Sequence, residues 1–179
     1  LRAPERLDEQ WRDRMKQHTG TKVGVVWGGS PVNQDDGNRS LALACFAELL
    51  ESPGCHFFSL QKGDPSGQAA PFIAAGVLTD LASDIRDFAD TAAIIASLDL
   101  VISVDTSVAH VAGALGKPVW ILLSGMPDWR WMLESETSPW YPTARLFRQR
   151  TIGEWGGVVQ EIEAALRASV TTQQHTASN

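Results

Sequence analysis

Residues 98–118 have the sequence LDLVISVDTSVAHVAGALGKP, in which a short apolar run leads directly into an amphipathic helix. The run from Leu98 to Val104 is interrupted only by Asp99 and Ser103, and its length and β-branched residues are typical of a strand buried on both faces. The apolar residues after it recur at helical spacing, which predicts a helix packed on the sheet. This pair of elements indicates an α/β protein.

Polar side chains lie at the junction between this strand and this helix, and the junction begins at Asp105. Thr106 and Ser107 open the helix, and His110 follows them by four and three residues, so all three project from one helical face. The N–H groups of the first turn and the helix dipole favour an anion just outside. Hydroxyls that only cap the helix would explain Thr106 and Ser107, but not the position of His110. The junction therefore predicts a phosphate-binding turn, with helix capping as the alternative.

The rest of the chain alternates continuous apolar runs with helical patterns. This alternation predicts a doubly wound α/β fold, in which a parallel sheet of about six strands carries helices on both faces. Asp90 is expected to cap one of the helices. Helices are predicted over 4–17, 41–51, 90–98 and 154–166, and strands over 22–27, 55–60, 76–81, 98–104, 119–123 and 144–148.

The sequence divides into three parts. Residues 1–20 hold a polar linker helix in which Leu7, Trp11 and Met15 recur every four positions, and residues 21–168 form the α/β domain. Residues 169–179 are rich in Thr, Gln and Ser without an apolar pattern, which predicts a disordered tail. Because the chain starts without Met and with an isolated charged helix, we expect a fragment of a longer protein.

Composition limits the classes of function. The 179 residues are 44% hydrophobic, which is enough for a core, and the net charge of −6 with dispersed Lys and Arg argues against nucleic-acid binding. No apolar run approaches the roughly 20 residues of a membrane span, and the charged N-terminus resembles no secretory leader, so a cytoplasmic location is the default expectation. Cys45 and Cys55 belong to no metal-binding motif and are expected to be small buried apolar groups.

The polar loops after the predicted strands should meet at one edge of the sheet. In parallel sheets, ligands bind beyond the carboxyl ends of the strands. The loops therefore bring a set of candidate ligand-binding residues toward one crevice: Ser30, Arg39, Gln61, Lys62, Asp105, Thr106, Ser107, His110 and Gly125.

Several segments resemble a known family. The pattern from Asp105 to Pro118, DTSxxHxAGALGKP, resembles the signature of the heptosyltransferase-like glycosyltransferases of family 9, and KVGVVWGGS at 22–30 resembles the first strand of their C-terminal half. A closer match is the glycosyltransferase domain that follows tetratricopeptide repeats in many bacterial proteins. The segments similar to that domain lie at 59–63, 87–92, 127–131 and 138–149, and the whole resemblance covers about residues 11–166.

This resemblance implies a GT-B glycosyltransferase, in which two Rossmann-like domains face each other across a cleft. The chain resembles the C-terminal domain, which holds the nucleotide-sugar donor. The acceptor site and the usual catalytic base would belong to an N-terminal domain, so no catalytic residue is assigned and the chain is expected not to turn over alone. That domain and the tetratricopeptide repeats are the expected partners. Half of a nucleotide-sugar epimerase and a noncatalytic nucleotide-binding scaffold are the alternatives.

The resemblance also implies roles around the leaving phosphate. Metal-dependent transferases use an Asp-x-Asp motif, whereas Asp35-Asp36 here lies in a Gly- and Asn-containing loop and is expected to be a solvated turn. A metal-free site without a cofactor is therefore expected. Lys62 would supply a cation, with a surface turn as its alternative, and Gln61 a neutral donor beside it. Arg39 would supply a second cation.

The turn itself would grip the diphosphate. Thr106 and Ser107 would hold it through hydroxyl and N–H groups, and His110 would donate to it or orient it. Asp105 is expected to cap the turn or to accept from a ribose hydroxyl, because a carboxylate repels phosphate. Gly125 would give a ligand room to approach.

Three of the seven Trp residues lie in the loop after the predicted strand 119–123. Trp131 and Trp140 are expected to pin this loop by packing. Asp128 and Trp129 are nearer the strand end and are candidates for a contact with the donor or with another domain.

Overall fold

The computed structural model describes residues 1–30, 32 and 36–177. In these residues, six parallel strands form one sheet in the order β3-β2-β1-β4-β5-β6. The strands are β1 (Thr21–Val26), β2 (Cys55–Ser59), β3 (Thr79–Asp80), β4 (Leu100–Val104), β5 (Val119–Leu123) and β6 (Ala144–Arg148). The order reverses between β1 and β4, as in a Rossmann-like fold, and this confirms the predicted fold class.

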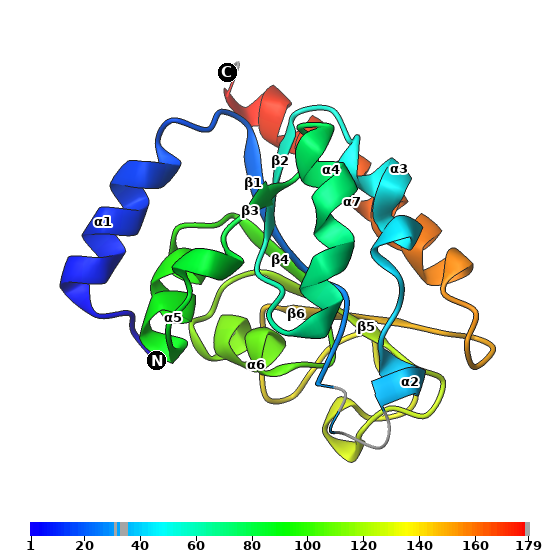
Figure 1. Cartoon of the computed structure of the whole chain (residues 1–179). Helices are drawn as coiled ribbons and strands as arrows, with labels where there is room; N and C mark the ends of the chain where they lie inside the picture. The colour runs from blue at the N-terminus through cyan, green and yellow to red at the C-terminus, as the bar shows by residue number, and fades with distance from the viewer. Residues whose placement is uncertain (31, 33–35, 178–179) are drawn as a thin grey trace.

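Helices cover both faces of the sheet (Figure 1). One face packs against the 3₁₀ helix Leu43–Phe46, α3 (Ala47–Leu50), α4 (Ala70–Ala74) and α7 (Gly156–Ala177). The other packs against α1 (Glu5–Met15), α5 (Phe88–Ala96) and α6 (Ser107–Ala114). Side chains that alternate along each strand feed the two cores: in β1, Val23 and Val25 face the first core and Val26 the second.

Tertiary contacts change several predicted elements. The helix predicted over 41–51 begins only at Leu43 and is a 3₁₀ helix up to Phe46, before α3. At its start, the backbone N–H of Leu41 donates to the carbonyl of Trp27, and that of Leu43 donates to the side chain of Gln68. Short 3₁₀ helices occupy Asp64–Ala69 and Ala82–Asp84, and α2 (Asp36–Arg39) lies in the loop after β1.

Two helix ends also differ from prediction. The cap of α5 is Asp87, whose carboxylate accepts from the N–H groups of Ala89 and Asp90, so the expected cap at Asp90 is wrong. α7 runs to Ala177, into the segment predicted to be a disordered tail, and Val170 in this segment packs against the core. Residues 178–179 lie outside the described part.

Cys45 is exposed rather than buried, and Cys55 is half-buried. In the part of the chain that the structure describes, no helix has the length and apolarity needed to cross a membrane.

Candidate functional site

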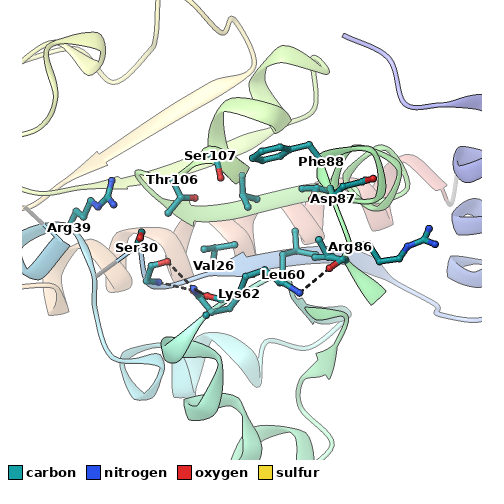
Figure 2. A pocket seen from close by; sticks show the side chains of 17 residues that line it. Val26, Ser30, Arg39, Leu60, Lys62, Arg86, Asp87, Phe88, Thr106 and Ser107 are labelled. Atoms are coloured by element: carbon teal, nitrogen blue, oxygen red, sulfur yellow. Dashed lines mark hydrogen bonds between the residues drawn. The ribbon is translucent and has the colours of Figure 1, made fainter. Parts of the chain in front are cut away.

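A cavity of about 600 Å³ opens at the carboxyl edge of the sheet, where the strand order reverses between β1 and β4 (Figure 2). The loops after β1, β2 and β4 and the start of α5 line it. Its walls are formed by Val26, Gly28, Gly29, Ser30, Arg39, Leu60, Gln61, Lys62, Gly63, Ile85, Arg86, Asp87, Phe88, Thr91, Thr106, Ser107 and Val108. Six of the nine predicted edge residues are in this set.

The start of α6 forms one wall. Thr106 occupies the N-cap position, but its hydroxyl lies 3.0 Å from the hydroxyl of Ser103 and makes no capping hydrogen bond within the described residues. Capping by Thr106, the alternative explanation of this residue, is therefore wrong. The first-turn N–H groups of a helix have no intrahelical acceptors, so this end of α6 can bind an anion from the cavity.

Gln61 fastens two loops rather than facing a ligand. Its side-chain oxygen accepts from the N–H groups of Trp27 (3.1 Å) and Gly28 (2.8 Å), and its amide nitrogen donates to the carbonyls of Gly28 and Lys62. Both amide hydrogens are thus used inside the protein, and only 2% of the residue is exposed. The prediction that Gln61 donates to a phosphate is not supported by this geometry.

Lys62 has an ordered ammonium at the cavity. Its Nζ donates to the carbonyls of Ala82 (2.8 Å) and Ile85 (2.9 Å), which joins the loop after β2 to the loop before α5. An ammonium has three hydrogens, so one remains without a partner among the described residues. Figure 2 shows Lys62 on the opposite side of the cavity from Thr106 and Ser107.

Arg39 is held at the rim by two groups. Its Nε donates to the Asp36 carboxylate at 3.2 Å, and its Nη1 donates to the carbonyl of Asp105 at 3.1 Å. Gly29 lies close against the Arg39–Asp36 pair, since a Cβ added at Gly29 would lie 2.6 Å from the guanidinium of Arg39. Asp36 is therefore paired rather than a solvated turn residue, while Asp35 lies outside the described residues.

The wall contributed by the start of α5 was not predicted. Phe88 is 64% exposed and lines the cavity, to which Ile85 and Leu60 contribute further apolar side chains. Arg86 forms a bidentate pair with Asp90 at 2.9 Å, and this hydrogen bonding lowers the pKa of the buried Asp90 to about 2. The sequence does carry a signal for this wall. Asp87 is a helix-capping residue, and the aromatic Phe88 after it lies outside the apolar stripe of α5.

His110 does not line the large cavity with Thr106 and Ser107. Its Nδ1 lies 3.0 Å from the hydroxyl of Tyr141, and its ring stacks on Trp131 with a centroid distance of 5.1 Å. It instead borders a hollow of about 320 Å³ with Trp129, Arg130, Trp140 and Tyr141. Packing of the aromatic loop against α6 turns this side chain away.

Two further candidates lie at a third hollow, of about 340 Å³, which shares Arg39 with the large cavity. Asp105 and Asp128 both line it. The pKa of Asp128 is lowered by hydrogen bonds from the backbone and then the side chain of Arg130. Gly125 borders Ile152, where a Cβ would come within 3.0 Å of that side chain.

Within the described residues, no cluster of three or more His, Cys, Asp or Glu side chains is placed to hold a metal ion. The large cavity combines an open helix N-terminus and cations with an apolar wall. That combination suits a ligand with an anionic part and a flat apolar part, as in a nucleotide.

Comparisons with known proteins agree with this architecture. Residues 68–145 match glycosyltransferase family 9 (heptosyltransferase). The match includes α5, β4, α6 and β5, and therefore two walls of the large cavity. This segment is thus similar to part of a family 9 glycosyltransferase.

Solved structures show the same fold. The E. coli ADP-heptose lps heptosyltransferase II superposes with a TM-score of 0.70 at 18% identity, over 97% of this chain and 54% of that one. A family 9 glycosyl transferase from Veillonella parvula gives 0.58 at 18% identity, over 92% and 52%. The C-terminal domain of a group 1 family glycosyl transferase from Francisella tularensis gives 0.54 at 15% identity, over 95% and 85%.

A curated relative is the protein FlbA of Caulobacter vibrioides, which is 30% identical over 162 residues. The match covers 88% of this chain but only 27% of FlbA. The chain thus spans about a quarter of FlbA and about half of the heptosyltransferase II structure.

Proposed function

We propose that this chain is the donor-binding half of a metal-independent glycosyltransferase that moves a sugar from a nucleotide donor to a protein or glycan acceptor. The observation that carries the proposal is the large cavity at the point where the strand order reverses, with the uncapped start of α6 as one wall. Ligands of doubly wound sheets bind at such a point. The family 9 match over two walls of the same cavity supports this function.

The chemistry requires stabilisation of negative charge on the departing phosphate. The N-terminus of α6, with the hydroxyls of Thr106 and Ser107, would bind the diphosphate, and preorganised dipoles of this kind stabilise developing charge. Arg39 and the remaining N–H of Lys62 would add positive charge from the facing loops. The apolar wall around Phe88 would receive the base.

A second half would complete the enzyme. The chain spans about half of the heptosyltransferase II structure, and we propose that the acceptor site and the catalytic base lie in a further domain. The isolated chain would then bind nucleotide without transferring sugar. Tetratricopeptide repeats are the proposed additional partner.

A thermal-shift screen against UDP, GDP, CMP and ADP tests donor binding. A ligand that binds only the folded state at about 100 times its Kd adds roughly 2.7 kcal/mol of stability. For a chain of this size each kcal/mol raises the melting temperature by about 2–4 °C. We expect one nucleotide to give such a shift, and a flat response to all four would contradict the proposal.

A double variant locates the binding. Thr106→Val with Ser107→Ala should remove most of the shift, because it deletes both hydroxyls at the start of α6. Ser52→Ala is the control, since Ser52 lies in the turn before β2 at the opposite edge of the sheet. An undiminished shift in the double variant would place the nucleotide elsewhere.

A further inference from the structure

We propose that the hollow between α6 and the aromatic loop binds the pyranose ring of a sugar. The hollow is lined by His110, Trp129, Arg130, Trp140 and Tyr141 and has a volume of about 320 Å³. The inference rests on the proposed function and adds the place where carbohydrate is held.

The two outer Trp rings are not needed to anchor the loop. Trp131 is fully buried and already fixes the loop against α6 through His110. Trp129 and Trp140, by contrast, are 68% and 57% exposed. Their large apolar surfaces therefore remain available to a ligand.

The exposed rings are nevertheless held in a defined arrangement. Trp129 and Trp140 stand at 90° to each other with centroids 6.2 Å apart. The guanidinium of Arg130 lies 4.9 Å from the Trp129 ring centre and is itself fixed by Asp128 at 2.8 Å. Rings ordered before a ligand arrives lose less conformational freedom on binding.

The chemistry of the hollow matches a pyranose. One face of such a ring carries C–H groups with partial positive charge, which are attracted to the negative face of an indole. Its hydroxyls need donors and acceptors at the edge. Arg130 offers N–H donors, and the paired His110 and Tyr141, 3.0 Å apart, offer groups that can donate or accept.

The position is consistent with either sugar of a transfer reaction. His110 lies four residues after Thr106 on α6, which is about 6 Å along the helix axis. A ring in the hollow would thus be close to the phosphate turn, either as the sugar of the donor or as the terminal sugar of an acceptor.

Titration of the 15N-labelled 179-residue chain, followed through its indole N–H resonances, tests the inference. The probes are the methyl pyranosides of glucose, galactose and mannose, N-acetylglucosamine, and UDP- and ADP-linked sugars. We expect at least one probe to shift the Trp129 and Trp140 signals and to leave Trp120 and Trp155 unchanged, because those two rings lie in the other core cluster. Trp140→Ala should weaken this binding about fivefold or more, and Trp140→Phe should restore most of it.

The outcomes separate the two sources and the two proposals. A methyl pyranoside that binds beside saturating UDP or ADP indicates an acceptor sugar, and shifts that require the nucleotide-linked sugar indicate the donor's sugar. The inference is overturned if no probe moves the Trp pair, or if Trp140→Ala binds as well as the wild type. If UDP or ADP still shifts the Ser107 backbone amide in that case, the proposed function stands, and if no nucleotide does so, both proposals fail.

Discussion

The ammonium of Lys62 donates to the carbonyl oxygen of Ile85 at 2.9 Å, across the loops that border the large cavity. A second bond to Ala82 makes this side chain a bridge between the end of β2 and the start of α5. Under the proposed function, Lys62 would act on a bound phosphate in two ways, through its charge and through the position of the Phe88 wall. Only the charge of Lys62 is evident from the sequence.

Lys62→Met should consequently weaken binding of a nucleoside diphosphate. Hydrogen bonds to charged groups contribute about 1.5–3 kcal/mol, so we expect Kd to rise by roughly tenfold or more. Isothermal titration calorimetry measures this directly. Lys16→Met is the control, since Lys16 directly follows α1 and forms a solvent-exposed pair with Asp13. Equal affinities of the two variants would contradict the assignment.

Gln61→Leu should destabilise the fold itself. The variant leaves buried N–H groups of Trp27 and Gly28 without their acceptor, and each unsatisfied buried group costs about 1–3 kcal/mol. We expect a loss of about 2–6 kcal/mol in the free energy of unfolding measured with urea. In the exposed Gln68, the same substitution removes one bond to Leu43 and should cost only about 1 kcal/mol. Similar losses of unfolding free energy in both variants would show that Gln61 does not hold the loops after β1 and β2 together.

The sheet was predictable because its strands are continuous apolar runs. β5 and β6 have the predicted bounds, and the parallel order follows from the alternation of strands and helices. The start of the helix predicted over 41–51 was not predictable in detail, because the groups that accept from Leu41 and Leu43 lie on other elements, at Trp27 and Gln68. Local periodicity contains no information about such partners.

The candidate site, too, was predictable in part: the sequence predicts which residues lie at the edge, but not where their side chains point. Sequence order alone brings Ser30, Lys62 and Thr106 to one edge, since the carboxyl ends of parallel strands lie together. The direction of each side chain depends on packing that spacing does not encode. Helical spacing places His110 on the same face as Ser107. In the structure, however, the imidazole contacts Tyr141 and borders a separate hollow.

Gly113→Ala should disturb that hollow. A Cβ at Gly113 would lie 2.8 Å or less from three atoms of the Tyr141 ring, so the ring must move and its contact with His110 should be lost. Overpacking of this kind costs about 1–3 kcal/mol. Urea unfolding measures the loss. Gly157→Ala is the matched control, because no atom lies within 4 Å of its added Cβ and Ala is favoured in helices, so it should be neutral or stabilising.

The pair of Arg86 and Asp90 predicts a specific acid response. Hydrogen bonds from Arg86 lower the pKa of the folded Asp90 to about 2, from an ordinary value of 3.8. The folded chain thus binds this proton more weakly than the unfolded chain. The contribution of Asp90 to stability is therefore complete above about pH 4 and is lost as the pH falls toward 2.

The Asp90→Asn variant has no titratable group at this position. The difference in unfolding free energy between the wild type and Asp90→Asn should therefore shrink between about pH 4 and pH 2, as measured by urea unfolding at a series of pH values. In Arg86→Met the carboxylate loses its partner, and the pKa of Asp90 should rise toward or above its ordinary value because the group is buried. The decrease on acidification should then disappear, or turn into a gain, because the folded pKa of Asp90 no longer lies below that of the unfolded chain. Parallel pH profiles for all three proteins would mean that the Arg86 pair does not stabilise the ionised Asp90.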